Sequence, residues 1–136
     1  MLEIKPIQTK TEQENICKLC KIEFNPDCLA YCAREYKKNG ENGEAKLLGA
    51  AQFRIINNYG VIYDLAGINE NYDLEALVIM GRTVLSFIDS CKIQEVIIKT
   101  ANNNLPEILG FKKDENGVYK LNLDGYFDTP CNKNKK

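Results

Sequence analysis

The segment Val61-Ile62-Tyr63-Asp64-Leu65-Ala66 is an apolar run of strand length, and directly after it hydrophobic residues recur with helical spacing. The i, i+3, i+4, i+7 series consists of Leu74, Leu77, Val78, Gly81, Val84, Leu85 and Ile88. Asp73 can cap this helix, and Glu75 lies in its first turn. Val96-Ile97-Ile98 is the centre of another apolar run. The middle of the chain therefore predicts a strand over 60–68, the longest helix of the protein, and a strand over 93–100.

The residues before this unit predict one strand, one helix and two further strands. The expected bounds are 2–8 for the first strand, Thr9 or Thr11 to about Ile22 for the helix, and 28–36 and 46–56 for the two strands. A polar loop and a tight turn at Asn57-Asn58-Tyr59-Gly60 separate the later strands. Three neighbouring strands with short connections predict an antiparallel meander.

After the central unit the chain predicts a short helix and a last strand. The expected bounds are Asn102 to Leu109 for the helix and Val118 to Leu123 for the strand, with a further strand at Phe111 as an alternative. The order of elements, βαβββαβαβ, indicates an α/β (α+β) chain. We expect one domain over 1–127, followed by a basic C-terminal tail over 128–136.

Charge and apolar patterning exclude several classes of function. The 136 residues include 18 Lys and Arg and 19 Asp and Glu, which gives a formal net charge of -1. A general nucleic-acid binder needs a basic surface to displace counterions, so we expect no nucleic-acid partner. The longest apolar stretches are far too short to cross a bilayer, and residues 1–6 contain no apolar secretion segment. We therefore expect a cytoplasmic protein with no membrane partner.

The sequence contains no histidine, which limits the chemistry available to it. Nucleophile pairs of the Ser–His and Cys–His types are excluded, as are zinc sites that need imidazole. A general base must then be a carboxylate, a perturbed lysine, a tyrosine, a thiol or a relayed water.

Four of the six cysteines, Cys17, Cys20, Cys28 and Cys32, follow the spacing C-x2-C-x7-C-x3-C. This spacing allows a four-thiolate zinc site. The favoured interpretation differs, because the first two have the spacing of one buried helix face and the last two that of one strand face. We therefore predict small buried hydrophobic residues and no metal.

Two local segments and the order of elements together resemble the GNAT family of acyltransferases. Leu48-Gly49-Ala50-Ala51-Gln52-Phe53 is similar to a glycine-containing segment of the family's third strand. Asn104-Leu105-Pro106-Glu107-Ile108-Leu109-Gly110-Phe111 is similar to the N…Y-x-x-x-G-F segment that closes the family's core. The resemblance covers residues 2–127. It implies a single-domain acyl-CoA N-acyltransferase fold with a mixed, mostly antiparallel sheet flanked by helices.

The resemblance also implies that acetyl-CoA, or another acyl-CoA, is the cosubstrate. GNAT enzymes splay two adjacent parallel strands, and the thioester tail enters the gap; here the pair would be the strands over 60–68 and 93–100. The implied cofactor-binding residues lie at the end of the first strand, at the start of the long helix and before the short helix. They are Leu65, Ala66, Gly67, Ile68, Asn71, Leu74, Glu75, Ala76 and Asn104.

The sequence departs from the GNAT pattern at two places. The family's pyrophosphate loop reads R/Q-x-x-G-x-G/A, whereas the stretch here lacks the glycines and the Arg or Gln and carries Glu70, Asp73 and Glu75. Acidic residues in a first helical turn stabilise the helix but repel an anion. The family's usual general acid is a tyrosine, and its position falls on Pro106, which has no proton to donate. Both departures weigh against efficient catalysis.

Two functions are compatible with the resemblance. The first is an N-acyltransferase that moves an acetyl group to the primary amine of a small molecule or peptide, with Asp64 as base and Tyr119 as acid. Tyr63, Tyr72 and Tyr126 are further candidate acids. The alternative is a catalytically inactive GNAT-like module that binds a protein or small molecule in the same cleft. The family often pairs through sheet edges, so a homodimer is plausible with either function.

Overall fold

The computed structural model of the protein describes residues 1–36, 45–69, 72–99 and 104–127. Within these ranges the chain forms three helices and seven strands. The elements are β1 (Leu2–Pro6), α1 (Lys10–Cys20), β2 (Leu29–Tyr36), β3 (Ala45–Ile56), β4 (Tyr59–Gly67), α2 (Leu74–Ser90), β5 (Glu95–Ile98), α3 (Leu105–Leu109), β6 (Lys112–Lys113) and β7 (Tyr119–Asn122). The predicted tail over 128–136 and the candidate residue Asn71 lie outside the described residues.

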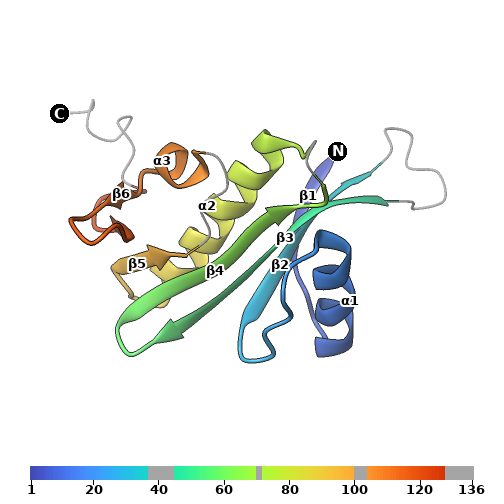
Figure 1. Ribbon diagram of the computed structural model, residues 1–136, viewed down its shortest axis with the longest axis horizontal. Helices are drawn as coiled ribbons and strands as arrows, with labels where there is room; N and C mark the ends of the chain where they lie inside the picture. The colour runs from blue at the N-terminus through green and yellow to red at the C-terminus, as the bar shows by residue number, and fades with distance from the viewer. Residues whose placement is uncertain (37–44, 70–71, 100–103, 128–136) are drawn as a thin grey trace.

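The seven strands form one sheet in the order β1-β2-β3-β4-β5-β7-β6 (Figure 1). β4 and β5 run parallel, and the other neighbouring pairs in this order are antiparallel. The predicted α+β fold with a mixed, mostly antiparallel sheet is therefore confirmed, and so is the meander of β2, β3 and β4. Because parallel strands need a long crossover connection, α2 links β4 to β5.

The local sequence explains where the helices begin and end. Thr9 caps α1, because its Oγ1 accepts a hydrogen bond from the Glu12 N–H at 3.1 Å. Asp73 caps α2 as predicted, with its Oδ1 accepting from the Ala76 N–H at 3.1 Å. α3 ends at Gly110, whose φ of 104° is readily adopted only by glycine. No helix in the described ranges has the length and apolar composition needed to cross a bilayer.

The two faces of the sheet are covered by different helices (Figure 1). α2 packs on the larger apolar core, to which β3 and β4 contribute Phe53, Ile62 and Leu65. The smaller cluster, under α1, consists of Ile16, Cys20, Cys32 and Ala50. Successive residues of a strand point to opposite faces, so β3 and β4 supply side chains to both sides.

A β-bulge in β4 sets which side chains face which helix. Gln52 of β3 pairs with Asp64, but Phe53 pairs with Ile62, which leaves Tyr63 as an extra residue on β4. Because of this extra residue, Ile62 and Leu65 both reach the α2 core although they are three positions apart. Asp64 points to the α1 face, where it meets Gln52.

β5 is shorter than the strand predicted over 93–100. α2 runs to Ser90, and the turn after it contains Lys92 with a φ of 65°, so the strand begins only at Glu95. β5 ends at Ile98, next to the point at which β4 leaves it. The extra strand expected at Phe111 forms directly after that residue, as β6.

Candidate functional site

β4 and β5 part at a defined position in the middle of the sheet. They pair from Tyr59 to Ile62 on β4, and the last bond runs from the Lys99 N–H to the Ile62 carbonyl at 2.8 Å. β4 continues to Gly67 and pairs there with β3 on its other side. Among the described residues, the backbone of Tyr63 to Gly67 therefore has no strand on the side of β5. The result is a short, unpaired strand edge inside the sheet.

Asp64 lies at this parting point, on the face that α1 covers. The Gln52 Nε2 donates a hydrogen bond to its Oδ2 at 2.8 Å, and Oδ1 has no hydrogen-bond partner among the described residues. Burial raises the pKa of the half-buried Asp64 carboxyl, the bond from Gln52 acts against this, and the nearby Glu23 carboxylate raises it further. A carboxylate with a raised pKa and one available oxygen is suited to accept a proton.

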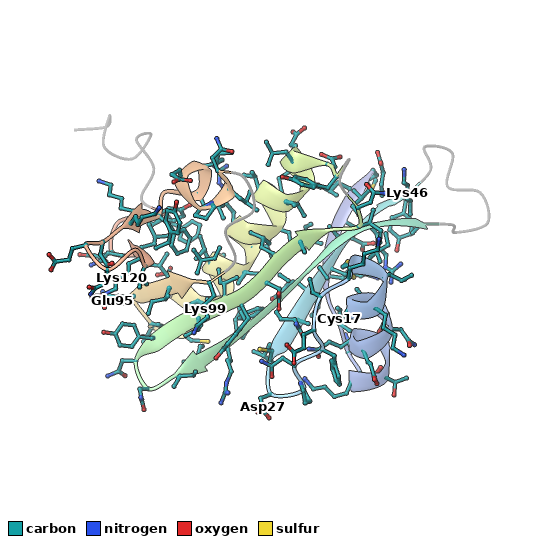
Figure 2. The ribbon with its side chains drawn as sticks, in the orientation of Figure 1. Cys17, Asp27, Lys46, Glu95, Lys99 and Lys120 are labelled. Carbon is teal, nitrogen blue, oxygen red and sulfur yellow. The ribbon has the colours of Figure 1, made fainter. Side chains whose placement is uncertain are left out.

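Two further side chains meet where β4 and β5 part, at Tyr63 of β4 and at Lys99, the residue after β5. The Lys99 Nζ lies 5.7 Å from the centroid of the Tyr63 ring, within the range of a cation–π contact. Lys99 forms no ion pair with the residues that the structure describes. Figure 2 shows Lys99 next to β4, near where β5 ends. The phenol of Tyr63 and the ammonium group of Lys99 thus lie close together, and Asp64 follows Tyr63 along β4.

Tyr119, the other predicted catalytic residue, lies on the opposite face of the sheet. It pairs across β5–β7 with Ile98 and packs against the α2 core. Its hydroxyl donates to the Glu107 Oε2 of α3 at 2.6 Å, and this bond raises the pKa of Tyr119 and lowers that of Glu107. The structure therefore does not bring Asp64 and Tyr119 together.

The remaining candidate tyrosines are held in different ways. The Tyr126 hydroxyl donates to the Leu109 carbonyl at 2.6 Å. The Tyr72 ring covers Gly67, where a Cβ would lie 2.1 Å from the Tyr72 Cβ, so only glycine permits this approach. The Tyr72 hydroxyl is buried without a hydrogen-bond partner in the described part of the chain.

Gln52 and Gln13 are not among the predicted site residues, and the structure places them behind Asp64. Gln52 is 0% exposed and Gln13 1% exposed. The Gln13 Nε2 donates to the Gln52 Oε1 at 2.8 Å. One signal was available: Gln52 interrupts an apolar strand two positions after the buried Ala50, on the same face.

Similarity to known proteins is found among solved structures. No protein-family model matches the sequence, and no curated protein matches it. A domain from Methanocaldococcus jannaschii is similar with a TM-score of 0.67 and 17% identity over 90% of this chain and 99% of that one. The PaiA N-acetyltransferase of Thermoplasma acidophilum, in complex with coenzyme A, is similar with a TM-score of 0.62 and 12% identity over 90% and 99%. The ribosomal-protein-S18-alanine N-acetyltransferase of Escherichia coli gives 0.60 and 12% over 88% and 89%.

This chain has the GNAT N-acetyltransferase fold. The predicted resemblance is thereby confirmed at the level of the fold. Within the GNAT fold, the unpaired edge of β4 fits an extended chain with amide groups, such as the pantetheine arm of CoA, because free backbone groups pair with amides. Leu65, Ala66 and Gly67 form this part of β4, and Ile68 follows it. Asn104 lies at the start of α3, where it caps the helix without a side-chain bond.

The start of α2 does not fit a diphosphate. Leu74, Glu75 and Ala76 form its first turn as predicted, but the Ala76 N–H already donates to the Asp73 carboxylate. The Glu75 carboxylate adds a second negative charge. A helix N-terminus attracts anions through its free N–H groups and dipole, and here an internal carboxylate occupies one of those groups. The start of α2 therefore offers an anion fewer free N–H groups than an uncapped helix would, beside two carboxylates.

The four clustered cysteines lie on the α1 side of the sheet, and all four are buried, as predicted. Burial is the main cause that raises the pKa of Cys17 and Cys28 to about 11 and of Cys20 to about 12. Figure 2 labels Cys17 on α1. The described residues contain no group of three or more side chains that could hold a metal ion. These thiols are neutral near pH 7 and pack as small hydrophobic groups.

Proposed function

We propose that this protein is an acyl-CoA-dependent N-acyltransferase that transfers an acetyl group from acetyl-CoA to a primary amine. The observation that carries the proposal is Asp64, a carboxylate with one available oxygen at the point where β4 leaves β5 in a GNAT fold. The acyl thioester supplies the activated carbonyl. The residues of this chain supply the base and the strand edge that orients the donor.

In this proposal the neutral amine attacks the thioester carbonyl, the new N–C bond forms, the C–S bond breaks and CoA leaves as a thiolate. Asp64 accepts the proton that the nitrogen loses, and the thiolate takes up a proton from water. A base at this position contributes when its pKa is close to the working pH, and burial moves Asp64 in that direction. The backbone of β4 after Tyr63 aligns the thioester arm, which contributes by fixing the orientation of the reacting groups. Tyr119 has no part in this step, because its hydroxyl is bonded to Glu107 on the other face.

The acceptor is proposed to be an amine of a small molecule or peptide. One neighbour of the same fold is named for the acetylation of a ribosomal protein at alanine, which supports a peptide acceptor. The half-buried Tyr63 precedes Asp64 on β4 and would lie near the acceptor, and the exposed Lys99 lies over its ring. The amine must be neutral to attack, and the Asp64 carboxylate then accepts the proton that its nitrogen loses as the N–C bond forms.

Binding of the donor is tested by thermal unfolding with acetyl-CoA in excess reductant. With about 1 mM acetyl-CoA and a dissociation constant of about 10 μM, saturation adds roughly 2.7 kcal/mol of stability. For a domain of this size that raises the midpoint by about 5 °C. S-acetyl-pantetheine is the matched probe, because it keeps the amide arm and lacks the diphosphate. We expect the two ligands to shift the midpoint by similar amounts at equal saturation.

Turnover is tested with a panel of amines, with the acetylated product detected by mass spectrometry. Asp64→Asn should lower kcat/KM by about a hundredfold or more, the usual contribution of a general base. Tyr119→Phe is the matched control and should leave kcat/KM nearly unchanged. No thermal shift with either thioester would contradict the proposal.

A specific observation favours one alternative, a catalytically inactive GNAT-like binding module. The carboxylates of Asp73 and Glu75 stand where the diphosphate of CoA would approach α2. This alternative predicts that acetyl-CoA neither stabilises the protein nor acetylates any amine in its presence. A shift with S-acetyl-pantetheine alone would instead identify a donor without a diphosphate.

A further inference from the structure

A series of hydrogen-bonded side chains, the amide chain, lies behind Asp64, and all of its hydrogen bonds run in one direction. The Lys10 Nζ donates to the Gln13 Oε1 at 3.0 Å, the Gln13 Nε2 donates to the Gln52 Oε1 at 2.8 Å, and the Gln52 Nε2 donates to the Asp64 Oδ2 at 2.8 Å. Every bond in this chain points from the cation toward the carboxylate. Aligned hydrogen bonds polarise one another, so the two amides transmit part of the field of Lys10 to Asp64.

The backbone leaves Gln52 only one orientation of its amide. Its Oε1 also accepts from the Asn25 N–H at 2.9 Å, and its Nε2 also donates to the Glu23 carbonyl at 2.8 Å. A backbone N–H can only donate and a carbonyl can only accept, so a flipped amide would lose both bonds. The remaining Nε2 hydrogen must then point at Asp64. All four hydrogen-bonding positions of this fully buried side chain are therefore used.

Gln13 is fixed in the same way. Its Nε2 also donates to the Asn25 carbonyl at 3.1 Å, and Lys10, which can only donate, holds its Oε1. Lys10 in turn donates to the Cys28 carbonyl at 2.6 Å. The segment after α1 thus holds these side chains in place through four backbone groups, three carbonyls and one N–H.

We propose that Gln52, supported by Gln13, is a positioning residue that binds one oxygen of Asp64 and presents the other oxygen to the acceptor amine. This inference rests on the proposed function. It adds that residues of α1, of the segment after α1 and of β3 hold the Asp64 carboxylate in place, although Asp64 itself belongs to β4. Other charged or titratable groups near Asp64 are Glu23, Cys17 and Cys28. The two thiols remain neutral in the working range, so the amide chain and Glu23 set the charge of the site.

The central experiment measures the pKa of Asp64 by carbon NMR of its carboxyl group, in protein without donor or acceptor. Gln52→Met keeps the length of the side chain and removes the donor, so the pKa of Asp64 should rise above that of the unmodified protein. Gln13→Met leaves the direct bond intact and should raise it less. Thr9→Ala, which alters α1 outside the amide chain, is the control and should leave it unchanged. Equal pKa values in the Gln52 variant and the unmodified protein would overturn the proposal.

A second readout needs no substitution of the buried Gln52. The side-chain NH2 resonances of Gln52 in the unmodified protein should titrate with the pKa of Asp64, and this titration should vanish in Asp64→Asn. NH2 resonances that do not respond to pH would overturn the proposal even if Gln52→Met fails to fold.

Measurements of turnover distinguish a failure of the positioning role of Gln52 from a failure of the proposed acyltransferase function. If the protein is the proposed enzyme, Gln52→Met should lower kcat by about tenfold or more with little change in the KM for the acyl donor, and its rate should depend on pH through a higher apparent pKa. If no amine is acetylated while the pKa of Asp64 still responds to Gln52, the proposed function fails and the positioning contact stands. An unchanged kcat and pH profile in an active enzyme would overturn the positioning role.

Discussion

The two faces of the central strands differ in chemistry although the same strands form them. The α2 face of β3 and β4 is apolar and includes Phe53 and Leu65, both 0% exposed. The α1 face of the same strands carries Gln52 and Asp64 beside buried thiols. The comparison indicates that one face stabilises the fold, and the other gives up apolar packing for a polar arrangement. Substitutions on the two faces should therefore differ in how much they change stability and in which property they change.

The largest effect is expected for Phe53→Ala on the α2 face. Phe53 packs against Tyr31 and Phe87, with ring centroids 5.6 and 5.7 Å away, so truncation leaves a cavity among aromatic rings. The loss should be about 3–5 kcal/mol of unfolding free energy. Urea unfolding measures it. The matched variant on the α1 face, Ile16→Ala, should cost less, since its cluster is smaller; equal losses would break the distinction between the faces.

The next effect concerns the thiols of the α1 face. Cys91 is exposed, whereas Cys17 and Cys28 have a pKa of about 11 because they are buried. Since the thiolate is the reactive form, buried thiols should react with a disulfide reagent near pH 8 at least about a hundredfold more slowly than an exposed one. The variant with Cys91 and Cys131 both replaced by serine isolates the buried group. Rapid modification of that variant in the native state would show that the α1 face opens readily.

A smaller effect is expected where α1 begins. Thr9→Ala removes the hydrogen bond from the Glu12 N–H to the capping hydroxyl, which should cost about 1 kcal/mol of unfolding free energy. Thr9→Ser keeps the bond and is the control. The measurement is again urea unfolding. A loss well above this value would mean that the α1 face depends on its helix as strongly as the other face depends on α2.

The smallest effect is a pH dependence of stability that arises from Asp64. Burial holds its pKa above the unfolded value of about 3.9, so its protonated form favours folding. That contribution is fully present below the unfolded pKa and is lost as the pH rises through the raised native value. Asp64→Asn lacks this loss, so its stability relative to that of the unmodified protein should increase as the pH rises. Parallel urea-unfolding profiles for the two proteins between pH 3.5 and 7 would contradict the raised pKa.

Much of the fold could be predicted because its signals are local. The periodicity of α2, its cap at Asp73 and the turn between β3 and β4 all lie within a few residues of the features they set. These signals identified the strand–helix–strand unit and the meander. The end of β5 could not be read in the same way, because it depends on where β4 diverges.

The candidate site was harder to predict. It depends on which face of the sheet each side chain of β4 occupies, and on hydrogen bonds between residues that are far apart in the sequence. The extra residue at Tyr63 changes which side chains of β4 face α1, and nothing in the apolar run marks it. The bond between Gln13 and Gln52 joins residues 39 positions apart. Asp64 was proposed from its place on the central strand and stays a prediction, and the same reasoning could not reveal that Tyr119 faces the other side.

The unpaired edge of β4 also has a consequence for the solubility of the protein. Exposed strand edges at the rim of a sheet invite other chains to add a strand, and this is a route to aggregation. From Tyr63 to Gly67 the free edge lies inside the sheet, with β5 beginning alongside the same strand. This edge belongs to an inner strand of the sheet and not to a strand at its rim, where another chain would pair. The molecule thus keeps unpaired backbone groups on β4 at a position that does not favour the addition of a strand from another molecule.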